Sequence, residues 1–259
     1  MNRRADAHPI SVIILTAAIV VIVIVASAYI TAALSTSSGN LEFQTMQKTT
    51  TALGDIINSM AFKQYATDGI QMNLRYGDEE VFNSLGYTIT ITYNSTKTLT
   101  LNLLPTANFS YVQGTGYIVL PVGQTYLSGN GSLFASASNS LVNIFEWKNG
   151  KVAYISTLPR IQYATQEVTF FNNTKATYVY LNYIQFNTTS TLPHISFANI
   201  FTFKTVASSL TVQTWKIVTG SLTVASNNCS SGCSFQVTPP TVRTVVIVLS
   251  TSTITLSKG

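Results

Sequence analysis

The residues from Ile10 to Leu34 form an unbroken run of 25 uncharged positions, of which fourteen are Ile, Val or Leu. At the centre of a bilayer these side chains favour insertion by about 4 to 8 kcal/mol. As a helix the run would be about 37 Å long, more than the roughly 30 Å of a hydrocarbon core. A helix also satisfies its own backbone in lipid. The pattern therefore predicts a membrane-crossing helix.

The apolar run is followed by small polar residues and then by a second helical pattern. Residues 35–40, STSSGN, indicate a break, a hinge or a softened helical turn. From 41 to 63 the apolar positions recur at helical steps of 3, 4 or 7, namely Phe43, Met46, Leu53, Ile57 and Met60. Such a stripe is more typical of packing against the same chain than against neighbouring subunits, although different faces of one helix can do both.

From about Gly69 onward the pattern changes to the alternation of β-strands. Tyr87–Tyr93 and Thr98–Leu103 alternate across a short polar turn and predict a hairpin. A second hairpin is predicted around Asn149-Gly150, because this dipeptide accepts positive φ. Further strand candidates are Gly116–Leu120, Glu167–Phe171, Thr177–Tyr183, Ile200–Val206, Leu210–Val218, Ser221–Ala225, Ser234–Val237 and Val242–Leu249.

These patterns predict an α+β chain: a long N-terminal hydrophobic helix followed by an antiparallel β-sandwich ectodomain, Ig-like or barrel-like. We expect a short basic leader over 1–5, a helix over 6–65 with an apolar part (10–34) and an amphipathic part (41–63), and a β-rich domain over 66–259. The β-rich domain is either one elaborated sheet pair or two sandwiches meeting near 158–163.

Charge is sparse and suggests how the chain lies across a membrane. Only 9 % of the residues are charged, against about 25 % in a typical domain, and the net charge is +5. The basic residues form no stripe of the kind that binds nucleic acid. Arg3 and Arg4 precede the apolar run, and no Lys or Arg follows it before Lys48. The positive-inside rule therefore places the N-terminus in the cytoplasm and the residues after 34 outside.

The N-terminal region has three interpretations. It is a secretory signal peptide cleaved after the A-x-A-like Ala26-Ser27-Ala28, an uncleaved single-span anchor, or the assembly helix of a filament subunit. The third interpretation comes from a resemblance. A short basic leader ending in Arg4-Ala5, a long Ile/Val/Ala helix and a Thr-rich ectodomain resemble the archaeal type IV pilins and archaellins. Asp6-Ala7-His8-Pro9 departs from the pattern, because that family usually becomes apolar sooner.

The resemblance implies a structural subunit of an extracellular filament, used for adhesion or motility. A prepilin peptidase would cut after Ala5, so the processing residues would be Arg4, Ala5 and Asp6. The partners would be the membrane before assembly, the assembly machinery, and then copies of the chain itself. Small and β-branched residues would pack the helices together. The expected assembly positions are Ile14, Ala18, Val21, Val25, Ala28 and Ala32. The alternatives are a membrane-anchored accessory or binding protein and a β protein secreted after Ala28.

Two kinds of modification are expected if the ectodomain lies outside the cell. Cys229 and Cys233 are expected to form a local disulfide at a hairpin tip, because C-x3-C without two further ligands is not a zinc site. Six Asn-x-Ser/Thr triplets are N-glycosylation candidates, of which we expect some to be occupied. They begin at Asn94, Asn108, Asn130, Asn172, Asn187 and Asn228.

The sequence contains no constellation typical of an enzyme. Its two histidines are His8 and His194, and a lone histidine is more often structural than catalytic. The one acidic cluster, Asp78-Glu79-Glu80, lacks the spaced oxygen ligands of a calcium loop. We therefore expect no catalytic residues, no metal and no cofactor.

Overall fold

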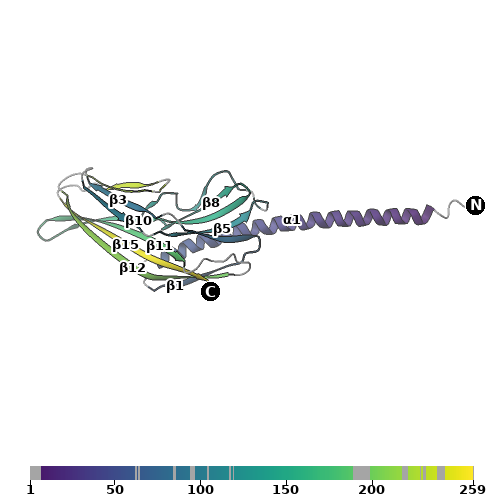
Figure 1. Cartoon of the computed structure of the whole chain (residues 1–259), viewed down its shortest axis with the longest axis horizontal. Helices are drawn as coiled ribbons and strands as arrows, with labels where there is room; N and C mark the ends of the chain where they lie inside the picture. Colours follow the sequence, from purple (N-terminus) through teal and green to yellow (C-terminus); the bar gives the residue numbers. More distant parts are fainter. Residues whose placement is uncertain are drawn as a thin grey trace, which may run out of the picture.

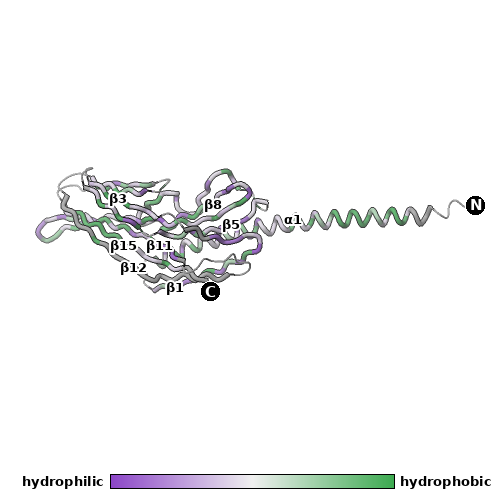
Figure 2. Tube along the Cα trace, viewed as in Figure 1, coloured by the Kyte–Doolittle hydropathy of each residue, from purple (hydrophilic) through white to green (hydrophobic). Residues whose placement is uncertain are grey.

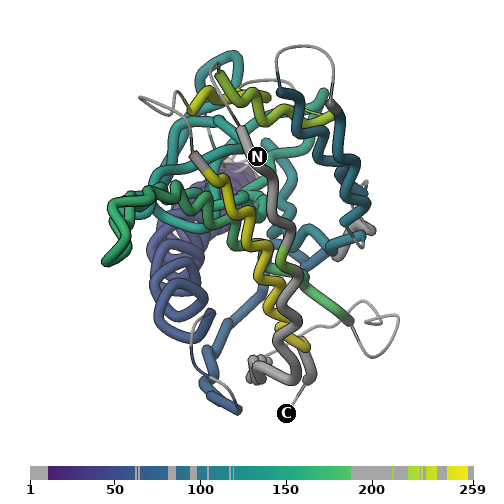
Figure 3. The backbone as a smooth tube through the Cα atoms, turned by 90° about the vertical axis from the view of Figure 1, so that its left-hand side faces the viewer, coloured from purple at the N-terminus to yellow at the C-terminus, as the bar shows by residue number. Residues whose placement is uncertain are grey.

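The computed structural model describes residues 7–61, 63, 65–83, 86–93, 97–103, 105–116, 118, 120–188, 199–217, 221–227, 229, 232–237 and 243–258. Within these ranges, one long helix projects from one end of an elongated β-rich body (Figure 1). The C-terminal half of the helix runs alongside the sheets (Figures 1 and 3), and the N-terminal half stands clear of them (Figure 1). The chain is therefore α+β, with an apolar helix first and β-sheets after it.

The helix, α1, runs from Ala7 to Met60 without interruption. Of the alternatives expected at 35–40, a break and a hinge do not occur, and the continuous helix is compatible only with a softened helical turn. The hydroxyls of Ser35 and Thr36 donate to the carbonyl oxygen of Ala32 at 2.9 and 3.0 Å. This back-bonding satisfies both hydroxyls within helical geometry, and a single interior glycine costs only about 1 kcal/mol relative to alanine. The polar linker thus continues the helix.

The largest sheet has six strands among the described residues, in the order β1-β12-β15-β11-β10-β7. Their bounds are β1 (Thr67–Met72), β12 (Asn199–Ile217), β15 (Arg243–Lys258), β11 (Lys175–Thr188), β10 (Ile161–Thr169) and β7 (Phe134–Ser136). The two segments expected at 200–206 and 210–218 are one continuous strand, β12, whose register with β15 shifts between Thr205 and Ala207.

This sheet is mixed, whereas an antiparallel one was expected. Strand β15 pairs antiparallel with β12 and parallel with β11, and β7 pairs parallel with β10. The reason is topological. Strands β11 and β12 run in opposite directions, and β15 lies between them, so it must be parallel to one of the two.

Two smaller sheets complete the described part of the body. A five-stranded sheet has the order β2-β5-β9-β8-β6, and a four-stranded sheet has the order β14-β13-β3-β4. The five-stranded sheet comprises β2 (Gly77–Asn83), β5 (Ala107–Gly114), β9 (Val152–Pro159), β8 (Val142–Asn149) and β6 (Thr125–Ser128). The four-stranded sheet comprises β14 (Ser234–Val237), β13 (Leu222–Ser226), β3 (Thr88–Tyr93) and β4 (Lys97–Asn102).

Both predicted hairpins are confirmed. In the first, β3 pairs with β4 from Thr88 opposite Asn102 to Tyr93 opposite Lys97. In the second, β8 pairs with β9, and Gly150 takes a φ of 59° at the turn. The Gly116–Leu120 segment forms no strand among its described residues.

Two hydrophobic cores share the six-stranded sheet. One lies between the C-terminal half of α1, the five-stranded sheet and one end of the six-stranded sheet. The other lies between the four-stranded sheet and the opposite end of the long strands of the six-stranded sheet. Strand β11 reaches both, because Val179 belongs to one core and Ile184 to the other. The long strands therefore join the two cores, while the division into two sandwiches near 158–163 stays a prediction.

Among the described residues no sheet closes on itself, since the six-stranded sheet ends at β1 on one side and β7 on the other. The finer expectation of an Ig-like or barrel-like ectodomain is accordingly not confirmed.

Candidate functional site

The most unusual surface of the molecule is the apolar part of α1 from Ser11 to Leu34, the projecting segment. Every residue in it is exposed, with Ile13 at 67 % and Leu34 at 61 %. Figure 2 shows this stretch as a continuous hydrophobic rod outside the β-rich body. Among the described residues α1 is the one helix long and apolar enough to cross a membrane. A membrane anchor and a signal sequence both have this character.

The six expected assembly positions all lie in the projecting segment, and all are exposed. They follow one another at steps of 3 and 4 residues, so α1 brings them to one face. The set consists of three larger aliphatic residues and three alanines: Ile14, Val21, Val25, Ala18, Ala28 and Ala32. This face presents apolar surface in which the alanines leave room for close helix approach.

Threonines in the projecting segment carry no unsatisfied hydroxyl. Thr16 donates to the carbonyl oxygen of Val12, and Thr31 to that of Ser27, each at 2.8 Å. An unpaired hydroxyl in an apolar environment costs several kcal/mol on hydrocarbon transfer scales. Internal bonding therefore lets the segment be covered by lipid or by apolar side chains.

The helix enters the β-rich body at Gly39 and is fixed there by Glu42. The carboxylate of Glu42 accepts hydrogen bonds from the backbone N–H groups of Arg75, Tyr76 and Gly77 at 2.9 to 3.0 Å. It also accepts one from the Tyr111 hydroxyl at 2.8 Å. Charge-assisted bonds of this kind are about twice as strong as neutral ones. One acidic side chain thus binds α1 to the start of β2 and to β5.

A buried polar group beneath Glu42 completes the contact. The amide nitrogen of Gln113 donates to the carbonyl oxygen of Gly39 at 3.0 Å. The hydroxyl oxygen of Tyr111 lies 2.8 Å from the Gln113 amide oxygen. Burial raises the pKa of Tyr111, and its hydrogen bond to Glu42 and the negative charge of Glu42 raise it further. A Cβ at Gly77 would lie 2.2 Å from the Tyr111 hydroxyl. Glycine is therefore required where the backbone approaches this ring.

Further contacts hold the rest of the buried half of α1. Gly54 packs so closely on β8 that an added Cβ would lie 2.8 Å from the Ile144 side chain. Asn58 accepts a hydrogen bond from the Leu141 N–H at 2.8 Å. The Ser252 hydroxyl donates to the carbonyl oxygen of Ala61 at 2.7 Å, just past the end of α1. The helix is thus anchored at both ends of its buried half.

Neither Glu42 nor Gly54 was identified from the sequence as a functional residue. For Glu42 a signal did exist, because it is the first acidic residue after the apolar run. Its backbone partners lie 33 to 35 residues away, and Tyr111 lies 69 away. No local pattern indicates which donors such a carboxylate will meet.

Several predicted site residues lie outside the described part of the chain. These are the processing residues Arg4, Ala5 and Asp6, the glycosylation candidates Asn94 and Asn228, and His194.

Cys229 and Cys233 form a disulfide with a Cα–Cα distance of 5.6 Å. Gly232, within its loop, accepts a hydrogen bond from the Phe134 N–H at 3.3 Å.

The four described glycosylation candidates differ in accessibility. Asn172 is exposed in the β10–β11 turn, where its side-chain oxygen accepts a hydrogen bond from the Thr174 N–H. The side-chain oxygen of Asn130 accepts a 2.9 Å hydrogen bond from the buried Arg160. Asn187 lies exposed near the end of β11. Asn108 lies in β5 and lines a pocket.

Among the described residues there is no group of three or more His, Cys, Asp or Glu side chains that could hold a metal ion. Comparisons with protein-family models, curated proteins and solved structures found no match to this chain. The geometry of α1 and its contacts is thus the basis for the functional argument.

Proposed function

We propose that this chain is a structural subunit of an archaeal extracellular filament of the type IV pilus kind, which polymerises through the apolar part of α1. The observation that carries the proposal is the contrast within one uninterrupted helix. The projecting segment is wholly exposed, whereas the half from Phe43 to Met60 is packed into the β-rich body.

The exposed apolar surface needs a cover in either of two environments. Removing each large aliphatic side chain from water is favourable by about 1.5 to 3 kcal/mol of free energy. Lipid supplies that cover before assembly, while the subunit waits in the membrane. In the filament, the projecting segments of neighbouring copies replace the lipid, and the alanine positions permit close packing. The subunit thus exchanges one apolar environment for another.

The firm attachment of α1 supports the same function. A helix fixed to its ectodomain at Glu42 and again at Gly54 transmits its own orientation to the whole β-rich body. Packing identical helices in a regular array would then arrange the bodies regularly around them. In this proposal the bodies coat the filament and mediate adhesion or motility at the cell surface.

A substitution at Val21 tests directly whether the projecting segment assembles the filament. Val21→Asp places a charge in the middle of the projecting segment, where it opposes both lipid and helix packing. We expect no filaments from cells expressing this variant, while the β-rich body keeps its unfolding temperature. Val21→Leu is the matched control and should give normal filaments in electron micrographs. Normal filaments from Val21→Asp would contradict the proposal.

A second candidate function rests on the length of α1, which is enough for it to cross a membrane by itself. In that case the chain is a singly anchored accessory or binding protein. N-terminal sequencing of the mature protein separates the candidates. A start at Asp6 supports the filament subunit, a start at Met1 supports the simple anchor, and a start at Tyr29 supports a secreted protein.

A further inference from the structure

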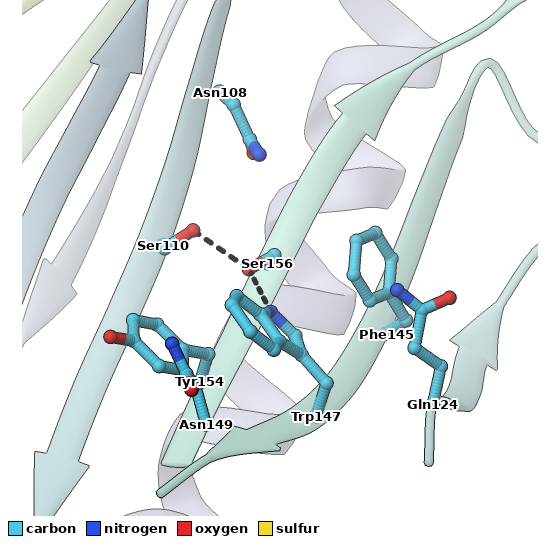
Figure 4. Close-up of a pocket in the computed structure, with 8 residues that line it drawn as sticks. All are labelled: Asn108, Ser110, Gln124, Phe145, Trp147, Asn149, Tyr154 and Ser156. Atoms are coloured by element: carbon cyan, nitrogen blue, oxygen red, sulfur yellow. Dashed lines mark hydrogen bonds between the residues drawn. The ribbon is translucent and has the colours of Figure 1, made fainter. Parts of the chain in front are cut away.

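The five-stranded sheet carries a pocket on the face turned away from α1. Alternation along its strands separates the two faces: Ile144 and Ile155 belong to the core beneath α1, whereas Phe145, Trp147 and Tyr154 line the pocket. The pocket has a volume of about 470 Å³. Figure 4 shows side chains from β5, β8 and β9 converging on it, with the helix behind the sheet. That volume lies within the range of small-ligand sites.

We propose that this pocket binds a neutral saccharide, with one sugar ring lying against Trp147. The proposal goes beyond the filament and does not depend on it. Trp147 stacks on Tyr154, with ring centroids 4.3 Å apart and planes 13° from parallel. The partly negative face of an aromatic ring attracts the weakly positive C–H groups on the flat side of a pyranose. The pair therefore offers a stacking surface for a sugar.

The tryptophan is oriented before any ligand arrives. Its indole N–H donates to the Ser156 hydroxyl at 3.0 Å, and the Ser156 and Ser110 hydroxyls are 2.8 Å apart (Figure 4). Both serines are buried. A side chain held by buried hydrogen bonds loses little freedom on binding, which favours affinity.

The polar groups around the pocket are suited to hydroxyls rather than to charges. The side-chain oxygen of Asn108 is buried and has no hydrogen-bond partner among the described residues. A rotation of the Asn108 side chain would bring this unpaired acceptor to a ligand donor in the pocket. Gln124 and Asn149 add two amides, and the lining contains no Lys, Arg, Asp or Glu. A nucleotide or an acidic lipid headgroup would leave its phosphate without a cation here, whereas a sugar supplies neutral hydroxyl donors.

Saturation-transfer NMR on the full-length chain tests the proposal. The chain is kept in solution by a sugar-free amphipathic polymer, because glycoside detergents would occupy the site. The probes are the methyl glycosides of glucose, galactose, mannose and N-acetylglucosamine, with sorbitol as an open-chain polyol lacking a ring face. We expect saturable transfer to the ring C–H protons of at least one glycoside, with a dissociation constant of about 1 to 10 mM, and none to sorbitol.

Variants connect that signal to the pocket. Trp147→Ala should weaken binding at least about tenfold, and Asn108→Ala about threefold or more. The matched control, Tyr178→Ala, removes a ring from a stacked pair in β11, outside the pocket, and should bind normally. Unfolding temperatures show that each variant is folded. If Trp147→Ala does not fold, Asn108→Ala alone decides the matter.

Three results would overturn the proposal. The first is the absence of saturable binding by every glycoside up to 50 times the upper end of the expected range. The second is equal binding by the wild type and the folded pocket variants. The third is a glycan found covalently attached to Asn108 by mass spectrometry, because that glycan would itself fill the pocket.

Discussion

Glu42 illustrates how a single side chain sets the direction of a long element. It is half-buried at the point where α1 leaves the β-rich body, and it gathers three backbone N–H groups and one phenol. Without its carboxylate the backbone N–H groups would lose this acceptor while staying partly shielded from water, whereas the Tyr111 hydroxyl still reaches the Gln113 amide oxygen. The orientation of the projecting segment relative to the sheets therefore depends strongly on this residue.

Glu42→Ala should lower the free energy of unfolding by about 2 to 3 kcal/mol, because several hydrogen bonds to a charged group are lost at a partly buried position. Glu42→Gln should cost less, since its amide oxygen still accepts. Urea denaturation of the full-length chain measures both changes. Asp55→Ala, which removes an exposed carboxylate from the same helix, is the control and should change stability by no more than about 0.5 kcal/mol. Similar losses for Glu42→Ala and Asp55→Ala would show that the contact at Glu42 is not stabilising.

At the scale of the element, α1 combines two surfaces in one helix. The projecting segment is apolar all round and is not buried against any other described part of the chain, whereas the buried half has one face packed on the sheets. Phe43, Met46 and Leu53 belong to that buried face, and residues such as Asp55 on another side are exposed. Close approach at Gly54 brings the backbone of α1 against the side chain of Ile144. The helix is therefore exposed over its N-terminal half and closely packed against the sheets over its C-terminal half.

Gly54→Val should destabilise the chain by about 1 to 3 kcal/mol, because the added atoms overlap the Ile144 side chain and force the helix outward. The comparison is with Ala52→Val, which adds the same kind of β-branched side chain at an exposed position of the same helix. That control should cost only about 0.5 kcal/mol through helix propensity. Denaturation curves for the two variants measure the difference. Equal effects would mean that α1 does not pack closely on β8.

At the scale of the whole molecule, stability should depend on pH mainly through buried tyrosines. Tyr87, Tyr111 and Tyr183 are buried, and burial is the first cause that raises the pKa of each one. The folded chain therefore holds these phenols neutral at pH values where the unfolded chain ionises them near pH 10. Because the unfolded state then binds fewer protons than the native state, stability falls as pH rises.

We expect the free energy of unfolding to be insensitive to these groups below about pH 9. Above about pH 10 it should decrease, by at most about 1.4 kcal/mol per pH unit for each of the three tyrosines. Urea denaturation between pH 8 and 11.5 measures this slope. Tyr111→Phe should make the slope shallower by the contribution of one tyrosine to the pH dependence of the unfolding free energy. An unchanged slope in that variant would contradict the assignment.

Local pattern was sufficient for the elements whose stabilising contacts are close in sequence. The apolar run over 10–34 predicted a helix from its length and unbroken apolar character, and the stripe from Phe43 to Met60 predicted one from its periodicity. The β3–β4 and β8–β9 hairpins followed from alternation and from the turn at Asn149-Gly150. In each case the hydrogen bonds lie within one helix or between two strands that are consecutive in the chain, so a short stretch of sequence contains the necessary information.

Contacts between distant segments decided the rest. The placement of β15 between β11 and β12 made the large sheet mixed, and it depends on which strand edges are free once the rest of the chain has folded. The same is true of Glu42, whose donors come from β2 and β5, and of the pocket around Trp147, to which separate strands contribute. Periodicity shows which face of a strand is buried, but it does not identify the neighbouring strand, because pairing over long separations depends on chain closure and on competition among all strands.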